Sequence, residues 1–291
     1  MSDPYDLDGK VVLVTGASRG VGTAIAVAAA AKGAKVACAA RSTKASPKPL
    51  PGTIDETVET VIDAGGEAMA VPTDLSRPEE IEAMVAAPVE AWGRLDVIVN
   101  NAAVTFVGEL DIPIKRYNLI MDINLRAPVL TAQAALPHLR AAGRGRILSL
   151  SSQAAIRPVP GLMAYGMSKM ALERMTTDLA RQLYRDRIAV NCFRIDLPVA
   201  SEGTLANMGD VDLTNWEPTS VPADGIMWML EQPDSYSGQC ESMWDLRHRE
   251  NIMPSLAEEE HPAKPPLQFI NGLYDLDADN RFTRDPESSG G

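Results

Sequence analysis

The chain has 291 residues, 45% of them hydrophobic, which is enough to bury the core of one large α/β domain. Its 39 acidic and 27 basic residues give a formal net charge of −12, which argues against nucleic-acid binding because phosphate contacts require basic clusters. No apolar run is long enough to span a bilayer, and the polar start of the chain lacks the pattern of a secretory signal. We therefore expect a cytoplasmic protein with neither membrane nor nucleic-acid partners.

Cysteine and histidine usage gives no indication of a metal site. The three cysteines, Cys38, Cys192 and Cys240, are odd in number and widely spaced, so the pattern favours buried, inert thiols over a disulfide framework or a zinc site. The three histidines show no paired ligand spacing and are interpreted as surface or packing residues: His138, His248 and His261.

Short apolar runs alternate with longer helical patterns along the chain. In chain order the pattern predicts strands at Lys10–Thr15, Lys35–Ala40, Ala68–Pro72, Leu95–Asn100, Arg146–Leu150, Ile188–Phe193 and Gln239–Met243. Between them it predicts helices at Gly20–Lys32, Thr53–Ala64, Pro78–Trp92 (capped by Ser76), Pro113–Arg140, Met163–Asp186 and Pro222–Leu230. The polar, proline-containing segment Ser42–Gly52 is expected to be a loop. This order is typical of an α/β fold: a doubly wound parallel sheet of the Rossmann type, covered by helices on both faces.

The composition changes near Pro254. We expect residues 1–253 to form one Rossmann-type domain, and residues 254–291 to form an acidic, proline-containing C-terminal extension. Two interpretations of the extension stay open. Its polar composition is typical of a disordered tail, whereas the apolar cluster Leu267–Tyr274 indicates docking on the same or a neighbouring subunit.

A glycine-rich turn follows the first predicted strand and opens the first predicted helix. Its sequence, Thr15–Gly22, allows a tight turn and a close backbone approach to a pyrophosphate, while the helix N-terminus offers N–H groups and a positive dipole end to the phosphates. A glycine-rich turn alone is weak evidence, but its position between strand and helix strengthens the interpretation. The predicted cofactor-binding residues of this turn are Gly16, Ser18, Arg19, Gly20, Val21 and Gly22.

The second predicted strand ends at Ala40, before Arg41 and Ser42. An acidic residue there would accept hydrogen bonds from a ribose 2′-hydroxyl and favour NAD, but none is present. Arg19 and Arg41 instead place two cations near the expected adenosine ribose, where a 2′-phosphate would be attracted. The sequence therefore favours NADP(H). In the alternative interpretation, Arg41 is a solvated side chain, Arg19 only caps the loop, and NAD is the cofactor.

Further polar residues follow the third and fourth predicted strands, at the sheet edge where ligands bind in open α/β folds. Asp74 is expected to accept a hydrogen bond from the adenine amino group, and Leu75, Asn101 and Ala102 are further predicted cofactor-binding residues. Asn100 is expected to tie neighbouring strands and to line the adenine-ribose cleft. In the alternative interpretation Asp74 and Asn100 only end their strands, since Asp and Asn are common at such positions.

Tyr165 and Lys169 are four residues apart on a predicted helix, which places them on one face about one turn apart. An ammonium near a phenol stabilises the phenolate, so we expect Lys169 to lower the pKa of Tyr165. The pair could then exchange a proton with a substrate oxygen. Ser152, at the end of the fifth predicted strand, should enter the same site, and Asn124 lies inside the long fourth helix.

These motifs in this order resemble the compact branch of the short-chain dehydrogenase/reductase family over roughly Leu7 to Met243. The family carries a Thr-Gly-x-x-x-Gly-x-Gly turn, an Asn-Asn-Ala-Gly segment and a tetrad of Asn, Ser, Tyr and Lys. Here Ala103 replaces the last glycine of the second motif. A weaker similarity, in the long loop Ser42–Gly52, is to hydroxysteroid dehydrogenase-like members. The resemblance assigns the tetrad to Asn124, Ser152, Tyr165 and Lys169.

The resemblance implies a role for each of these residues. Tyr165 exchanges the proton with the substrate oxygen, Ser152 hydrogen-bonds that oxygen, Lys169 binds the nicotinamide ribose, and Asn124 holds a relay water. Tyr165 and Lys169 thus also count as cofactor-binding residues. Many relatives are tetramers that pair their long fourth and fifth helices, so a homo-oligomer, tetramer or dimer, is expected.

One departure from the family concerns the loop after the sixth strand. Ile195 and Asp196 stand where the family usually has Pro-Gly, which puts the geometry of the substrate loop in doubt. Val199 is still expected to offer backbone groups to the nicotinamide carboxamide, and Ser201 to contact a cofactor phosphate.

The expected activity is hydride transfer between NADP(H) and a carbonyl or secondary alcohol of a medium-sized hydrophobic small molecule, because the expected pocket walls, Gln153–Met163 and Ala200–Pro218, are rich in apolar residues. Those residues are Ile156, Val159, Leu162, Met163, Leu205, Met208 and Trp216. The alternatives are a non-catalytic NADP(H)-sensing protein, which should have lost tetrad residues, and an NAD-dependent alcohol dehydrogenase. An extended-branch isomerase or dehydratase, an enoyl reductase and a hydrolase fit the motif spacing less well.

Overall fold

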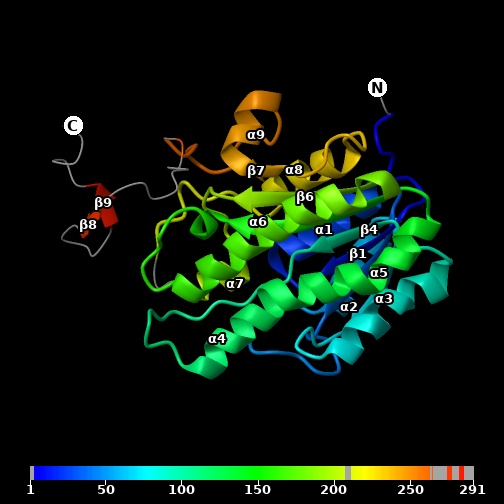
Figure 1. Cartoon of the computed structure of the whole chain (residues 1–291), viewed down its shortest axis with the longest axis horizontal. Coiled ribbons are helices and arrows are strands. Elements are labelled where there is room, and N and C mark those ends of the chain that lie inside the picture. The colour runs from blue at the N-terminus through cyan, green and yellow to red at the C-terminus, as the bar shows by residue number, and fades with distance from the viewer. Residues whose placement is uncertain (1–2, 207–210, 263, 265–273, 277–281, 285–291) are drawn as a thin grey trace.

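A computed structural model describes residues 3–206, 211–262, 264, 274–276 and 282–284. Its centre is a seven-stranded sheet in the order β3-β2-β1-β4-β5-β6-β7, in which every paired strand is parallel (Figure 1). The strands are β1 (Val11–Thr15), β2 (Lys35–Ala40), β3 (Glu67–Pro72), β4 (Val97–Asn100), β5 (Gly145–Ser152), β6 (Ile188–Ile195) and β7 (Cys240–Ser242). A separate antiparallel pair joins β8 (Tyr274–Leu276) to β9 (Phe282–Arg284).

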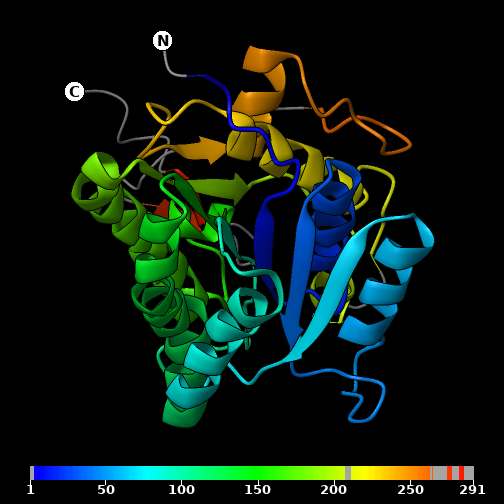
Figure 2. The same ribbon diagram turned by 90° about the vertical axis from the view of Figure 1, so that its right-hand side faces the viewer.

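Helices cover both faces of the sheet (Figure 2). The longer ones are α1 (Gly20–Ala31), α2 (Ile54–Asp63), α3 (Pro78–Trp92), α4 (Ile114–Met121), α5 (Ala127–Ala141), α6 (Met163–Leu183), α8 (Ser220–Glu231) and α9 (Met243–Glu250). Shorter turns are η1 (Asp122–Arg126), η2 (Gln153–Ala155), η3 (Tyr184–Asp186) and α7 (Glu202–Leu205). Helices α1, α2 and α8 pack on one face, and α3, α5 and α6 on the other.

Burial on both faces explains the continuous apolar strands. Along β1, Val12 and Val14 join the cluster beneath α1 and α8, while Val11 and Leu13 join the cluster beneath α3 and α5. Because successive strand residues point to opposite faces, a strand with two covered faces needs apolar residues at every position. The strand order reverses between β1 and β4, which is where open α/β sheets place their ligand sites.

The predicted fold class is therefore confirmed, with three local corrections. The expected helix Pro113–Arg140 is interrupted by the π-helical turn η1. Ser76 was expected to cap α3, but the N-cap is Arg77, because the Ser76 hydroxyl donates instead to the carboxylate of Asp74 (2.8 Å). Helix α9 was not predicted. Ser242 caps it by accepting from the N–H of Asp245 (3.1 Å), a Ser-x-x-Asp pattern that the sequence does contain.

The segment after α9 packs back onto the rest of the chain. Glu217 accepts hydrogen bonds from the Ser255 hydroxyl (2.7 Å) and the Leu256 N–H (2.9 Å). The N–H of Glu259 donates to the Thr214 carbonyl (3.1 Å). For this first part of the C-terminal segment, the structure agrees with the interpretation that the extension docks on its own chain. The apolar residues 267–273 expected to dock lie outside the described residues.

Candidate active site

The turn after β1 is shaped by glycines that leave no room for a side chain. Gly16 and Gly20 have positive φ angles of 68° and 59°, which favour glycine. A Cβ on Gly22 would lie 2.2 Å from the Gly16 carbonyl oxygen, and one on Gly16 would lie 2.8 Å from the Ala102 Cα. The chain therefore turns tightly at the start of α1, where a helix N-terminus can bind an anion.

Asn101 holds this turn against the end of β4. Its side-chain amide donates to the carbonyls of Thr15 (2.8 Å) and Gly16 (3.2 Å). The Thr15 hydroxyl accepts from the N–H groups of Asn101 (3.1 Å) and Ala102 (3.2 Å). Asn100 donates to the Ser149 hydroxyl of β5 (3.3 Å), so it ties neighbouring strands as predicted. Asn101 and Ala102 thus lie beside the glycine turn and support its shape.

Arg19 is placed differently from the prediction. Its guanidinium donates to the carbonyls of Pro51 (2.6 Å), Leu50 (3.0 Å) and Gly52 (3.0 Å) in the loop after β2. The Ser42 hydroxyl also donates to Gly52 (2.8 Å). Three backbone carbonyls thus converge on one guanidinium, and Arg19 caps the loop. This was the alternative interpretation of Arg19 in the sequence analysis.

Arg41 and Asp74 follow β2 and β3 and lie close enough to interact electrostatically. Arg41 is exposed, and its charge is available at the end of β2. Burial would raise the pKa of Asp74, but hydrogen bonds from Ser76 and the charge of Arg41 lower it on balance, so the carboxylate is charged at neutral pH. Leu75 packs on the cluster beneath α3 and α5.

Ser152 and Tyr165 meet where β5 ends and α6 begins. Burial raises the pKa of Tyr165, and the interaction with the Ser152 hydroxyl opposes this as the smaller effect. Helix α6 can approach because residue 166 is glycine: a Cβ there would lie 2.6 Å from the Ala154 carbonyl oxygen. The prediction that the pKa of Tyr165 is lowered is therefore wrong, because burial is the larger effect and raises it.

Lys169 lies one turn further along α6 and is buried. Its ammonium donates to the Leu150 carbonyl (2.8 Å) and lies 5.6 Å from the centre of the Tyr165 ring. Burial lowers the pKa of Lys169 to about 8, against the opposing effects of Cys192 and Glu173. A lysine with this pKa can exchange a proton near neutral pH.

Glu173 continues the same helix face and was missed by the sequence analysis. Its carboxylate accepts from the Ser151 hydroxyl (2.6 Å) and from Arg194 (2.8 and 2.5 Å). The signal was the spacing Lys169 to Glu173, four residues on one helix, which places an acid one turn beyond the lysine.

Asn124 lies in the π-helical turn η1 and is buried. Its side-chain amide accepts from the N–H of Val104 (2.8 Å) and donates to the carbonyl of Val104 (3.0 Å) and to the Ser168 hydroxyl (3.0 Å). It therefore contacts the residue next to Lys169 rather than Lys169 itself. A π turn changes the backbone hydrogen bonding at one point of a helix and is frequent at functional sites.

A cavity of about 430 Å³ lies beside Tyr165. Ser152, Val21, Val199 and Ser201 line it, so two predicted catalytic residues and three predicted cofactor residues share one space. Of the predicted apolar lining, Val159, Leu162 and Trp216 are present. Ile156, Met163 and Leu205 are not among the lining residues, and Met208 lies outside the described residues.

The departure at Ile195-Asp196 has a structural explanation. The buried Asp196 carboxylate accepts from the Ser242 hydroxyl (2.5 Å) and from the N–H of Trp244 (3.1 Å) at the start of α9. Burial raises the pKa of Asp196, and these hydrogen bonds oppose the effect. The carboxylate thus fastens the loop after β6 to α9. Beyond it, Val199 pairs with Glu217 in an isolated bridge.

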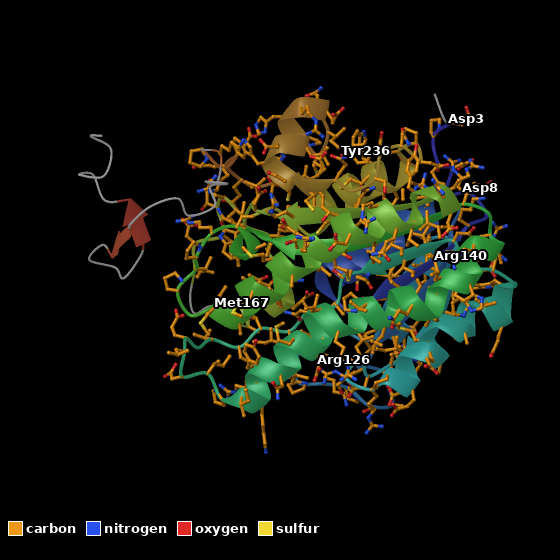
Figure 3. All side chains as sticks on the ribbon, viewed as in Figure 1. Asp3, Asp8, Arg126, Arg140, Met167 and Tyr236 are labelled. Carbon is orange, nitrogen blue, oxygen red and sulfur yellow. The ribbon has the colours of Figure 1, made fainter. Side chains whose placement is uncertain are left out.

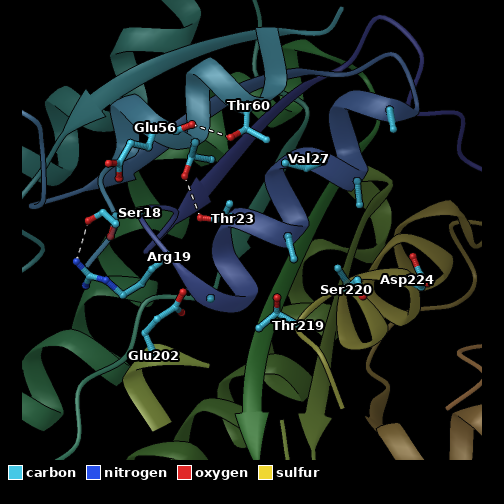
Figure 4. Close-up of a pocket in the computed structure, with 17 residues that line it drawn as sticks. Ser18, Arg19, Thr23, Val27, Glu56, Thr60, Glu202, Thr219, Ser220 and Asp224 are labelled. Carbon is cyan, nitrogen blue, oxygen red and sulfur yellow. Dashed lines mark hydrogen bonds between the residues drawn. The ribbon is translucent and has the colours of Figure 1, made fainter. Parts of the chain in front are cut away.

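A second cavity of about 470 Å³ follows the outer side of α1 (Figure 4). Ser18, Arg19 and Gly20 line one end of it, together with Glu202. A Cβ on Gly20 would lie 3.3 Å from the Glu202 carboxylate, so an acid stands beside the N-terminus of α1. The sequence analysis did not single out Glu202, because only the fold brings α7 to this turn.

His261 was interpreted as a surface or packing residue, yet it lines the cavity beside Tyr165. Its ring also contacts the edge of Trp244, with ring centres 6.4 Å apart. No signal in the sequence indicates this position, since it results from the C-terminal segment folding back along Glu217 and Thr214.

Comparison with known proteins identifies the class that this fold and site define. Residues 10–197 match the family model described as short chain dehydrogenase. The chain is 32% identical over 272 residues to hydroxysteroid dehydrogenase-like protein 2 of Danio rerio, covering 91% of this chain and 65% of that protein. It therefore spans less than two thirds of the length of this relative.

Two solved structures are similar over most of the chain. A putative dehydrogenase from Xanthomonas campestris is 30% identical with a TM-score of 0.77, covering 94% of this chain and all of that one. A metagenomic short-chain oxidoreductase in complex with NADP is 30% identical with a TM-score of 0.68, covering 82% and 99%.

The chain belongs to the short-chain dehydrogenase family, a family of oxidoreductases that bind nicotinamide cofactors. Across the described residues there is no helix whose length and apolar character would let it cross a membrane. Nor does that part of the chain gather three or more side chains able to hold a metal ion.

The burial of Lys169 leads to a prediction about stability. Its pKa is about 8 in the folded protein and 10.5 ordinarily, so below pH 8 the native state carries the full cost of a buried ammonium. Between these pH values the native state loses its proton first, and the cost is relieved. We expect Lys169→Met to raise the free energy of unfolding by roughly 1–3 kcal/mol near pH 7, with a smaller gain near pH 10.

Urea unfolding of both proteins at the two pH values measures this difference, with Lys48→Met as the exposed-lysine control. A gain that does not change with pH, or a loss near pH 7, would contradict the burial of a charged Lys169.

Proposed function

We propose that this chain is an NADP(H)-dependent enzyme that interconverts a carbonyl group and a secondary alcohol in a medium-sized small molecule. The observation that carries the proposal is that Ser152 and Tyr165 line one cavity and interact closely enough to affect the pKa of Tyr165, with the buried Lys169 one helical turn away. The glycine turn beside them is a cradle that any Cβ would fill, which fits a dinucleotide backbone.

Each side chain has a task in the proposed reduction. The Tyr165 hydroxyl gives its proton to the substrate oxygen, and the Ser152 hydroxyl donates a hydrogen bond to the same oxygen. The Lys169 ammonium, 5.6 Å from the phenol ring, stabilises the phenolate left behind. A bound nicotinamide would supply the hydride to the carbon. Hydride and proton together convert the carbonyl into the alcohol, and oxidation runs in reverse.

The preference for the 2′-phosphorylated cofactor is supported by Arg41. It is exposed at the end of β2, where no acidic residue stands to bind a ribose hydroxyl. Arg19 contributes less than its sequence position indicated, because its donors bind loop carbonyls. The similar metagenomic oxidoreductase in complex with NADP supports the same choice.

A homo-oligomer, tetramer or dimer, is part of the proposal. Large apolar side chains are exposed around the start of α4 and along α6, namely Val107, Leu110, Ile114, Met167 and Met170. Met167 is labelled on the ribbon of α6 in Figure 3. Burying such side chains against a second copy would be favourable.

Tyr165→Phe tests the chemistry. Removing the hydroxyl removes the proton donor and leaves the ring, so we expect the rate of NADPH oxidation with a carbonyl panel to fall by about 10²-fold or more. NADPH binding, followed by cofactor fluorescence, should stay within about twofold. The exposed Tyr184→Phe is the matched control. Tyr165→Phe with wild-type turnover would remove Tyr165 from the mechanism, and NADPH binding without any turnover by the wild type would favour the non-catalytic sensing alternative.

Arg41→Ala tests the cofactor. Loss of a charge-assisted contact to the 2′-phosphate should raise KM for NADPH by about tenfold and leave KM for NADH nearly unchanged. Lys48→Ala, in the loop after β2, is the control. Steady-state kinetics with both cofactors measures the ratio. A wild-type enzyme that prefers NADH would overturn the proposal for NADP(H).

A further inference from the structure

The cavity beside Tyr165 contains one arginine that the proposed chemistry does not use. Arg157 lines it together with Ser152, Tyr165 and the apolar residues Val159 and Leu162. Arg157 is five residues beyond Ser152 in the chain and two residues beyond the end of η2. A cation in the same cavity as the proton-donating hydroxyl can bind an anionic group of the substrate.

The backbone at Arg157 is fixed. Its N–H donates to the Gln153 carbonyl (3.0 Å). Further along the same loop, the Gly161 carbonyl accepts from the N–H of Gly108 (2.9 Å). The side chain is half-buried. Arg157 therefore extends from a loop tied at both ends, so its backbone does not have to be ordered when the side chain binds a ligand.

No carboxylate among the described residues neutralises Arg157. The acidic side chain that shares the cavity, Asp196, is engaged by Ser242 and Trp244. Two buried arginines elsewhere in this acidic chain pair with acids, Arg194 with Glu173 (2.5 Å) and Arg247 with Glu217 (2.7 Å), and the half-buried Arg19 donates to three backbone carbonyls. Arg157 is half-buried in the ligand cavity, and its guanidinium forms no hydrogen bond or ion pair with any residue that the structure describes.

We propose that the substrate is an oxo acid or hydroxy acid whose carboxylate is bound by Arg157, while its carbonyl or hydroxyl oxygen meets Tyr165 and Ser152. This inference rests on the proposed oxidoreductase function and specifies its substrate class. A guanidinium fork matches a carboxylate in a bidentate geometry, and partial burial strengthens the pair relative to water. A carboxylate is the partner that the Arg157 guanidinium lacks among the described residues.

The other lining residues fit the same substrate. Val159, Leu162, Leu197 and Trp216 provide an apolar wall for a hydrocarbon chain between the two polar ends. The His261 ring, held in place by the C-terminal segment, completes the lining. The volume of about 430 Å³ suits a small or medium-sized molecule. The proposal therefore keeps the apolar chain predicted from the sequence and adds a charged end.

The test compares acids with neutral analogues of equal length. Levulinate and its homologues lengthened by one and two methylenes are assayed against their methyl esters, following NADPH oxidation. For at least one chain length the wild type should prefer the acid by about tenfold or more in kcat/KM, mainly through a lower KM. Added salt should reduce the preference, since it screens the ion pair.

Variants assign the preference to Arg157. Arg157→Gln should lower kcat/KM for the acids by about tenfold and change that for the esters by less than about twofold. Arg157→Lys should keep part of the preference, because it keeps the charge but not the fork. Arg185→Gln, an exposed arginine in η3 at the far end of α6, is the matched control and should change neither value.

A binding measurement separates this inference from the proposed function. Hexanoate and hexanamide are titrated calorimetrically into the protein with NADP⁺ present. Hexanoate should bind at least about tenfold more tightly, and Arg157→Gln should abolish that difference. Equal binding of the two compounds, or an acid preference that survives in Arg157→Gln, would overturn the role of Arg157 even if esters are reduced. If the protein reduces no carbonyl compound, but binds hexanoate and loses that binding in Arg157→Gln, the proposed function is overturned. The carboxylate site at Arg157 is then still supported.

Discussion

The site depends on a lysine buried inside the protein. Lys169 is 2% exposed, and its ammonium donates a hydrogen bond to the Leu150 carbonyl of β5. Placing an ammonium there is costly, and the fold lowers its pKa to about 8 rather than pairing it directly with an acid. Glu173 stands one turn away but is itself engaged by Ser151 and Arg194, so its charge opposes the effect of burial without neutralising the lysine. A group held near its titration point suits proton exchange, which the proposed chemistry requires.

Close backbone approach provides the rest of the arrangement. Gly166 allows α6 to lie against Ala154, which brings the hydroxyls of Tyr165 and Ser152 together. Gly16 and Gly22 allow the turn after β1 to close against the end of β4. Both contacts lie at the carboxyl ends of parallel strands, on either side of the point where the strand order reverses. The cavity between them has apolar walls, a pair of hydroxyls and one arginine that no described residue neutralises, so its lining favours a carbonyl compound with an anionic end.

Local patterns predicted much of this architecture. Strand and helix periods indicated the doubly wound sheet, and the spacing from Tyr165 to Lys169 placed both on one helix. Features set by distant contacts could not be predicted in this way. Arg19 looked available to a phosphate, but it binds carbonyls of residues 50–52 that the fold brings to it. From the sequence, His261 was expected at the surface or in packing. It lines the cavity because the C-terminal segment folds back along Glu217. The pKa of Tyr165 was expected to be lowered by its charged neighbour, whereas desolvation, which only the packed structure reveals, raises it.

The state of Lys169 can be measured directly. Lysine side chains labelled with carbon-13 at Cε can be titrated by NMR, with the Lys169 resonance identified by its absence in Lys169→Met. The structure predicts that this resonance titrates near pH 8, well below the ordinary lysine value of 10.5. A Lys169 resonance that titrates at the ordinary value would show that the ammonium is solvated, and would contradict the buried proton-exchanging pair on which the account rests.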